Sequence, residues 1–362
     1  MATLSAGGTQ GWAGMNVWGS REFDDHEQVC FFSDEKTGLR AIVAIHSTFL
    51  GPAAGGTRFK SYEGEESALD DALRLSRAMS YKSALAGMPV GGGKSVIIGD
   101  PGSIKTRALL HAFGRFIDRI GNTYATGEDV GITVADMDTV AEVTRFVGGT
   151  SAGTGDPSVH TADGFLHGLR AVLQSRFHTD SFEGVRVALQ GLGAVGWSIA
   201  ERLHAAGSKL VVADIRPDAV DRALRSFGAT SQPTETIHRA DVDIYAPCAL
   251  GGVITESSVG EIRAAAVAGA ANNQLATARA GVMLAERNIL FAPDFVINAG
   301  GIISGLEAAS RMPGRKPVEF APLEVRLAAI HDRLAEIFRR AQADGRPPEV
   351  VAEQMAREII GR

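Results

Sequence analysis

Two lysines whose surroundings suit acid/base chemistry, Lys82 and Lys94, lie twelve residues apart, and Gly91 to Gly93 run directly into the second lysine. Consecutive glycines lose much conformational freedom on folding, so such a run indicates a main chain that is approached closely or that needs a positive φ. A lysine held there can be stripped of water by a closing cleft. Its pKa then falls, so that it can act as a general base near neutral pH. Taken alone, GGGK is more typical of a tight turn with a solvated lysine.

Two other uses of glycine-rich segments fit the sequence poorly. A phosphate-binding P-loop needs a glycine five positions before the glycine of Gly-Lys-Ser, and that position is Met88, with Gly87 one residue away. A G-x-S-x-G match from Gly149 to Gly153 resembles the nucleophile elbow of hydrolases, but no strong strand pattern precedes it. We therefore favour neither a P-loop nor a hydrolase elbow.

The composition excludes several other classes of function. The formal net charge of the 362-residue chain is −6, which argues against nucleic acid as a partner because phosphate binding needs a basic face. No apolar run approaches the roughly 20 residues that a membrane-spanning helix needs, and no signal-peptide pattern opens the chain. Cys30 and Cys248 share no metal-ligand spacing and suggest a reducing compartment. We expect a cytoplasmic protein without a metal, a membrane or a nucleic-acid partner.

The lysines must be positioned by an α/β domain, which we expect over residues 1–148. Apolar residues at helical spacing precede Lys82, and a short apolar run after Lys94 is typical of a buried strand. The expected elements are paired strands at 29–32 and 39–46, a glycine-rich loop at 51–58, the helix before Lys82, a strand at 95–98 and a helix at 104–120.

The second half carries the dinucleotide-binding fingerprint in its required context. A strand at 185–189 leads into Gly191, Leu192, Gly193, Ala194, Val195 and Gly196, a helix follows at 197–206, and a second strand at 209–213 ends at Asp214. The three glycines make the turn, admit the pyrophosphate and allow close packing of helix and strand. The helix N-terminus binds the phosphates. Asp214 would accept from the ribose 2′-hydroxyl and favours NAD over NADP, although Arg216 weakens this preference.

Further strand patterns at 242–246, 265–268 and 289–292 complete a Rossmann domain, which we expect over residues 149–324. Residues 148–158, small and closed by Asp-Pro, are the best candidate for the linker before it. Amphipathic helices are expected at 323–343 and from Pro348 to Ile360. We expect this tail, residues 325–362, to pack back on the first domain or on a neighbouring subunit.

Several long motifs in a fixed order resemble the Glu/Leu/Phe/Val dehydrogenases, from about Asp25 to the C-terminus. They are LGPAAGGTR from Leu50, SYKSA from Ser80, GGGKSVIIGDP from Gly91, TGEDVGITVADMDT from Thr126, APCALGG from Ala246, AGAANNQLA from Ala268 and PDFVINAGG from Pro293. The similarity is greatest to the leucine, valine, phenylalanine and tryptophan dehydrogenases. It implies an N-terminal α/β substrate and oligomerisation domain, a C-terminal Rossmann domain, an active site in the cleft between them, and a homo-oligomer.

The resemblance also implies a role for individual residues. Lys94 would be the catalytic acid/base, Asp129 its partner in moving protons, and Lys82 the ligand of the substrate carboxylate. The other implied substrate-site residues are Ala54, Gly55, Gly56, Gly127, Asn273, Asn298, Ile302 and Gly305. The implied cofactor-site residues are the six of the fingerprint with Asp214, Ile215, Cys248, Ala249 and Asn272. The implied reaction is reversible and converts an L-amino acid, NAD and water into a 2-oxo acid, ammonium and NADH.

The chemistry suits these residues independently of the resemblance. The pKa of a lysine beside a second ammonium in a closed cleft is lowered by two effects, the loss of hydration and the neighbouring positive charge. Asp129 opposes this effect, so Lys94 and Asp129 should titrate as a coupled unit. A non-catalytic NAD-binding protein on the same fold is the first alternative, and the joint presence of both lysines and Asp129 argues against it.

A glutamate-type enzyme is the second alternative. The candidate side-chain pocket (Ala54, Gly127, Ile302 and Gly305) offers no charge for a side-chain carboxylate, which argues against this alternative. Two glycines in one pocket leave room for a large side chain. We expect activity on several apolar amino acids, with phenylalanine or another bulky substrate at least comparable to leucine.

Overall fold

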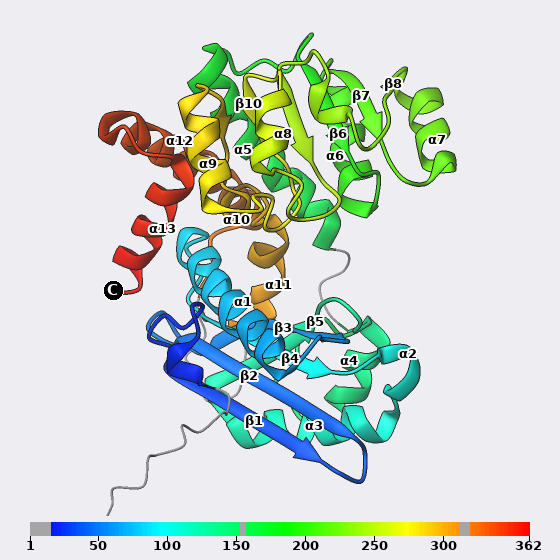
Figure 1. Cartoon of the computed structure of the whole chain (residues 1–362), viewed down its shortest axis with the longest axis vertical. Coiled ribbons are helices and arrows are strands. Elements are labelled where there is room, and N and C mark those ends of the chain that lie inside the picture. Colours follow the sequence, from blue (N-terminus) through cyan, green and yellow to red (C-terminus); the bar gives the residue numbers. More distant parts are fainter. Residues whose placement is uncertain (1–15, 153–156, 311–318) are drawn as a thin grey trace, which may run out of the picture.

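Two β-sheets at opposite ends of the molecule form the framework of the structure, a computed structural model that describes residues 16–152, 157–310 and 319–362 (Figure 1). The first is a five-stranded mixed sheet with the order β1-β2-β4-β3-β5, and the second is a six-stranded parallel sheet with the order β11-β10-β9-β6-β7-β8. The strands are β1 (Gln28–Asp34), β2 (Leu39–Ser47), β3 (Ala53–Lys60), β4 (Gly91–Ile98), β5 (Tyr124–Glu128), β6 (Arg186–Gln190), β7 (Lys209–Ala213), β8 (Thr230–Ser231), β9 (Ile244–Pro247), β10 (Ala266–Val267) and β11 (Leu290–Phe291).

Helices cover both sheets and fill the space between them (Figure 1). The α-helices are α1 (Glu65–Leu85), α2 (Pro101–Ile104), α3 (Arg107–Ile120), α4 (Val134–Ala141), α5 (Pro157–Phe177), α6 (Ala194–Ala205), α7 (Pro217–Phe227), α8 (Glu256–Glu261), α9 (Ala278–Glu286), α10 (Asp294–Ile297), α11 (Gly300–Ser310), α12 (Leu323–Asp344) and α13 (Pro348–Ile359). Short 3₁₀ turns are η1 (Val17–Gly19), η2 (Gly121–Thr123) and η3 (Ile237–Arg239). Within the described ranges, no helix is both long and apolar enough to cross a membrane.

The first sheet confirms the predicted strand pair and corrects the predicted glycine-rich loop. The strands predicted at 29–32 and 39–46 form the antiparallel pair β1 and β2. The loop predicted over 51–58 is wrong, because β3 begins at Ala53 and lies between β4 and β5, parallel to both. The strand expected after Lys94 also begins earlier, at Gly91, so the whole GGGK segment is extended.

Close approach, rather than positive φ, explains these glycines. None of Gly55, Gly56 and Gly91 to Gly93 has a positive φ. A Cβ on Gly55 would lie 1.8 Å from the carbonyl oxygen of Gly93, and a Cβ on Gly93 would lie 2.7 Å from the ring of Tyr124. Real Cβ atoms do not come so close to other atoms, so glycine is required where these strands and the neighbouring rings pack.

The second sheet confirms the predicted Rossmann fold. Strand β7 matches the predicted residues 209–213, and β6 is shifted by one residue from the prediction of 185–189. Helix α6 begins at Ala194, three residues before the predicted start at 197, because Gly193 is already its N-cap. In the register of β6 and β7, Gln190 pairs with Ala213, so the fingerprint and Asp214 follow the same edge of the sheet.

The C-terminal helices connect the two halves of the molecule. Helix α12 packs on α5, and α13 packs on α1. The Arg357 guanidinium lies 2.8 Å from Asp24 Oδ2, and Arg362 Nη2 donates to the carbonyl oxygen of His46 at 2.7 Å. The domain boundaries at 148 and 324 stay predictions, and the proposed linker at 148–158 lies partly outside the described residues.

A single methyl group should test the packing of the glycine strands. Gly93→Ala places a Cβ against Tyr124, and we expect it to lower the free energy of unfolding by at least about 1–3 kcal/mol, the usual cost of overpacking. The matched control is Gly260→Ala, because its Cβ meets nothing within 4 Å; it should leave stability unchanged or slightly increased. Urea unfolding of both variants measures the difference, and equal midpoints would contradict the packing argument.

Candidate active site

The first feature of the site is a buried ion pair between Lys94 on β4 and Asp129, which directly follows β5. Lys94 Nζ lies 2.5 Å from Asp129 Oδ2, and Lys94 is only 6% exposed. Strand β3 lies between β4 and β5, so the pair spans it. Gly56 makes this possible, since a Cβ there would lie 2.4 Å from the Glu128 carbonyl oxygen and 3.0 Å from Asp129 Cβ.

Opposing effects act on the protons of this pair. Burial lowers the pKa of Lys94, whereas the Asp129 carboxylate raises it. For Asp129, burial raises the pKa, but Lys94 and Arg58 outweigh burial and hold it below its usual range. Each group therefore depends on the charge of the other, and the two titrate as a coupled unit. Lys94 is the member that can become neutral, and Asp129 stays ionised.

The second lysine, Lys82, is brought to the same site by the last turn of α1. A Cβ on Gly92 would lie 2.0 Å from Ser80 N, so α1 and β4 are in direct contact there. Ser80 lies two residues before Lys82, and Gly92 lies two residues before Lys94. Burial lowers the pKa of Lys82 to about 8, with Asp294 raising it and Lys94 lowering it. Among the described residues, no carboxylate lies within ion-pair distance of the Lys82 ammonium. Within the described part of the chain, the site thus holds one lysine that is paired with a carboxylate and one that is not.

The fingerprint residues form a cradle at the start of α6. Gly191 has a φ of 105°, and a Cβ on Gly196 would lie 2.0 Å from the Gly191 carbonyl oxygen. Gly193, the N-cap, has open space where a Cβ would be, and no side chain caps the helix. A hollow of about 440 Å³, lined in part by Leu192, Gly193 and Ala194, opens beside this end. Uncapped N–H groups at a helix N-terminus suit a pyrophosphate.

Asp214 lies at the end of β7, where the sequence places the ribose-binding carboxylate. Its Oδ2 accepts from Leu192 N at 2.6 Å, and its Oδ1 accepts from Arg216 N at 2.9 Å. The guanidinium of Arg216 also pairs with Asp214 at 3.2 Å. Although burial raises the pKa of Asp214, these contacts outweigh burial and lower it. The neighbouring Ile215 is 86% exposed.

The loops after β9 and β10 meet the fingerprint and α10. A Cβ on Gly191 would lie 2.7 Å from Ala249 Cβ. Asn298 Nδ2 donates to Asn272 Oδ1 at 2.9 Å, whereas its own Oδ1 is buried without a hydrogen-bond partner among the described residues. Burial raises the pKa of the Cys248 thiol to about 12, so Cys248 is not an ionised nucleophile. Asn273 adopts a positive φ of 53°.

The four residues predicted to contact the substrate side chain differ in their surroundings. Ala54 is buried at 4% exposure, and Ile302 is half-buried. The atom nearest to a Cβ on Gly127 would be the Gly148 carbonyl oxygen at 3.7 Å, and a Cβ on Gly305 would meet nothing within 4 Å. A side chain larger than glycine would therefore fit at both glycine positions.

Three charged residues of this region were missed by sequence reasoning. Arg58 Nε lies 3.1 Å from Asp129 Oδ2, and Arg58 also pairs with Asp71. The charge of Asp294 raises the pKa of Lys82. Arg58 ends the motif LGPAAGGTR and Asp294 lies in PDFVINAGG, so the motifs contained a signal for these two residues. Asp71 lies in an ordinary helical pattern that carries no such signal.

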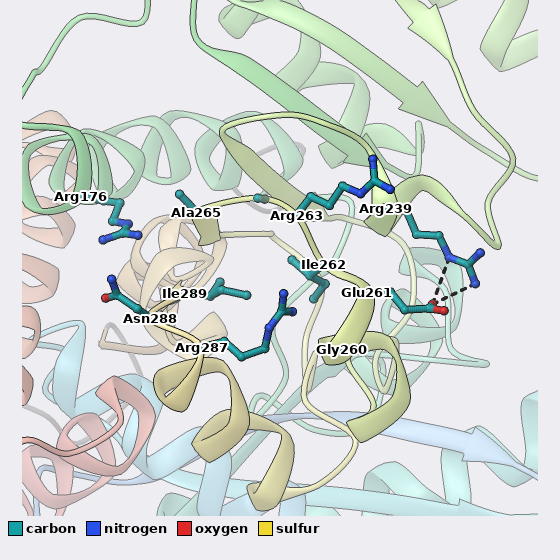
Figure 2. Close-up of a pocket in the computed structure, with 11 residues that line it drawn as sticks. Arg176, Arg239, Gly260, Glu261, Ile262, Arg263, Ala265, Arg287, Asn288 and Ile289 are labelled. Carbon is teal, nitrogen blue, oxygen red and sulfur yellow. Dashed lines mark hydrogen bonds and ion pairs between the residues drawn. The ribbon is translucent and has the colours of Figure 1, made fainter.

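A separate hollow of about 710 Å³ lies at the other edge of the parallel sheet (Figure 2). Its lining includes Ala265 and Ile289, which directly precede β10 and β11, whereas the fingerprint follows the carboxyl end of β6. Four arginines line it: Arg176, Arg239, Arg263 and Arg287. Figure 2 shows Arg239 directed to Glu261, with which it forms an ion pair at 2.9 Å. None of the predicted site residues lines this hollow.

Comparisons with known proteins identify the family of this chain. Residues 26–146 match the Glu/Leu/Phe/Val dehydrogenase dimerisation domain, and residues 216–345 match the Glutamate/Leucine/Phenylalanine/Valine dehydrogenase domain. The leucine dehydrogenase of Geobacillus stearothermophilus is 44% identical over 96% of this chain and 94% of its own length. The valine dehydrogenase of Streptomyces virginiae is 45% identical over 92% of this chain and 93% of its own length.

A solved structure shows the same arrangement of elements. The L-tryptophan dehydrogenase from Nostoc punctiforme superposes with a TM-score of 0.81 at 40% identity, covering 93% of this chain and 96% of that chain. The motifs that carry Lys82, Lys94, Asp129 and the fingerprint thus occur within matches that span almost the whole chain. The chain belongs to the Glu/Leu/Phe/Val dehydrogenase family.

Proposed function

We propose that this protein catalyses the NAD-dependent, reversible oxidative deamination of apolar L-amino acids to 2-oxo acids and ammonium. The observation that carries the proposal is the unequal pair of lysines at one site. Lys94 is buried and paired with Asp129, whereas Lys82 has no carboxylate partner among the described residues. A desolvated cation without a partner is costly, so Lys82 favours a ligand that brings its own carboxylate. The similarity to leucine, valine and tryptophan dehydrogenases supports the same class of reaction.

The chain's own groups divide the work of this reaction. Lys82 would bind the α-carboxylate and hold the α-carbon beside Lys94. When bound, NAD accepts a hydride from that carbon. Neutral Lys94 would take a proton from the water that attacks the resulting iminium carbon, and its protonated form would return the proton to the departing amine. Asp129 would fix the position of Lys94 and stabilise its ammonium form.

The cofactor proposed is NAD, held by the fingerprint residues with Asp214 and Ile215. The open space at Gly193 and the uncapped start of α6 suit the pyrophosphate. The lowered pKa of Asp214 keeps it ionised at neutral pH, so it would accept from a ribose 2′-hydroxyl and repel a 2′-phosphate. Arg216 is already engaged by Asp214, which reduces its availability for a 2′-phosphate. The loops with Cys248, Ala249 and Asn272 would lie along the nicotinamide and its ribose.

The domain roles follow the same proposal. Residues 1–148, with 325–362 packed against them, would form the substrate and oligomerisation domain, residues 149–324 would bind NAD, and the active site would lie in the cleft between them. The first family match is to a dimerisation domain, and β1 is an edge strand with Phe31 48% exposed, which supports a homo-oligomer. Cys30 and Cys248 are free thiols, which suits a reducing cytoplasm.

The role of Lys94 is tested by its removal. Lys94→Ala should lower kcat by a factor on the order of 10²–10⁴, the usual share of acid/base catalysis, while NADH still binds. The control is Lys105→Ala, which removes another lysine paired with an aspartate, Asp136, at 2.7 Å but lies outside the proposed site. NADH absorbance gives the rates and NADH fluorescence the binding. A Lys94→Ala enzyme with near-normal kcat would refute the assignment.

Lys82 should act on the substrate rather than on the cofactor. Lys82→Ala should raise KM for both the amino acid and the oxo acid, because the α-carboxylate would lose its cation in a closed site. Its pKa of about 8 adds a pH dependence. As the pH rises above about 8, Lys82 becomes neutral and the wild-type KM should rise, whereas the KM of Lys82→Ala should lack this rise. A change confined to the affinity for NAD would place Lys82 in the cofactor site instead.

The side-chain preference is tested with a substrate panel. The space at Gly127 and Gly305 leads us to expect turnover of several apolar amino acids, with phenylalanine or another bulky one at least comparable to leucine and far above glutamate. One methylene is worth about 1–3 kcal/mol in such a pocket, so the preference should be graded. Gly127→Ala should reduce kcat/KM more for phenylalanine and tryptophan than for valine. A wild type that clearly prefers valine, with aromatic substrates unaffected by Gly127→Ala, would refute the large pocket.

A further inference from the structure

One oxygen of Asp129 serves two cations. Lys94 Nζ lies 2.5 Å from Asp129 Oδ2, and Arg58 Nε lies 3.1 Å from the same atom. The side chain of Arg58 is 18% exposed and that of Asp129 is 22% exposed, so solvent screens this contact only in part. A carboxylate oxygen that accepts from two cations gives less of its charge to each of them.

Arg58 is itself held between two carboxylates. Its Nη1 lies 3.1 Å from Oδ2 of Asp71 on α1. Asp71 in turn pairs with Arg74 at 2.6 Å and accepts from the Tyr62 hydroxyl at 2.9 Å. The result is a chain of alternating charges that leads from the middle of α1 through Arg58 and Asp129 to Lys94.

We propose that Arg58 is a positioning residue for the reaction: it draws the charge of Asp129 toward itself and so weakens the hold of Asp129 on the Lys94 proton. Asp71 limits this effect of Arg58, because its negative charge pairs with the same guanidinium. The inference rests on the acid/base role of Lys94 proposed above. It explains how a lysine can keep a carboxylate neighbour for orientation and still give up its proton near neutral pH.

The direction of each influence follows from the charges. The positive charge of Arg58 lowers the pKa of Lys94, and the negative charges of Asp129 and Asp71 raise it. Without Arg58, Asp129 would have Lys94 as its main cation and would stabilise the ammonium form more strongly. A smaller fraction of the enzyme would then carry the neutral base at a given pH.

Several titratable groups of the neighbouring elements lie around this pair or around Asp71, and the expected shifts include their charges. They are Lys82, Asp71 and Arg74 on α1, Arg58 and Lys60 on β3, Tyr62 between these two elements, and Tyr124 on β5. Burial raises the pKa of Tyr124 to about 12, so it stays neutral over the working range. Arg58 and Asp71 are therefore the pair whose removal changes the charge near Lys94 in opposite directions.

A purely structural role for Arg58 is the competing explanation, because it links β3 to α1 through Asp71. Loss of such a link would lower activity or stability at every pH. It would not displace the pH at which Lys94 titrates. The pH profile of amino-acid oxidation therefore separates the two explanations, and the amine of the substrate titrates identically with every variant.

The experiment compares profiles of kcat/KM for amino-acid oxidation in three variants. In Arg58→Gln, the acidic limb should move to higher pH by roughly one unit, so that kcat/KM near pH 7 falls about tenfold, whereas the alkaline limb that Lys82 sets should stay in place. In Asp71→Asn, the limb should move to lower pH. Arg58→Lys, which keeps the charge, should restore the limb most of the way to the wild-type position.

Arg40→Gln is the matched control, since Arg40 lies on β2 and also pairs with a carboxylate of α1, Glu65, at 3.1 Å; its limb should not move. The inference is overturned if Arg58→Gln and Asp71→Asn lose activity with unmoved limbs, or if both limbs move in the same direction. If Lys94→Ala is inactive but the acidic limbs of Arg58→Gln and Asp71→Asn do not move, the proposed function stands and only the role of Arg58 is refuted. Active Lys94→Ala would overturn both.

Discussion

The buried ion pair between Lys94 and Asp129 is the constraint on which the rest of the site depends. A buried pair contributes little unless its geometry is good, because both charges lose their hydration. Here the partners come from β4 and from the end of β5, two strands that are not neighbours. The pair can form only if β3, which lies between them, has no side chains in the way. Gly56 meets that requirement, because a Cβ there would lie 2.4 Å from the Glu128 carbonyl oxygen and 3.0 Å from Asp129 Cβ. The chain entropy that this glycine loses on folding is the cost of forming the ion pair.

The glycines of β3 and β4 show where sequence reasoning failed. In GPAAGGTR and GGGK, local composition favours turns, yet β3 begins at Ala53 and β4 includes the whole of GGGK, so the predicted loop at 51–58 was wrong. The reason is non-local: the carbonyl oxygen of Gly93 and the ring of Tyr124 occupy the space where side chains would be. The Rossmann sheet was predicted well, because its fingerprint, strands and helix follow one another within a short segment.

A similar division holds for the site. Lys82, Lys94 and Asp129 could be named as candidates from motifs, because each stands in a distinctive local sequence. The contacts of Arg58 could not, since its partner Asp129 is 71 residues away and nothing in either segment specifies the other. Electrostatic partners of this kind depend on which strands are adjacent. That information exists only once the order β4-β3-β5 is known.

The two lysines also influence each other through their charges. The Lys94 ammonium lowers the pKa of Lys82, and because the repulsion between two charges is mutual, a charged Lys82 also disfavours a proton on Lys94. Asp129 pairs with Lys94 alone of these two lysines. A substrate carboxylate that pairs with Lys82 cancels the charge that acts on Lys94, so binding strengthens the affinity of Lys94 for a proton. By reciprocity, a proton on Lys94 strengthens the attraction of the site for the carboxylate. Arg58 opposes this increase in the proton affinity of Lys94, because it attracts part of the negative charge of Asp129. In the proposed mechanism, this balance would allow Lys94 to lose its proton for the attack by water and to regain it when the amine departs.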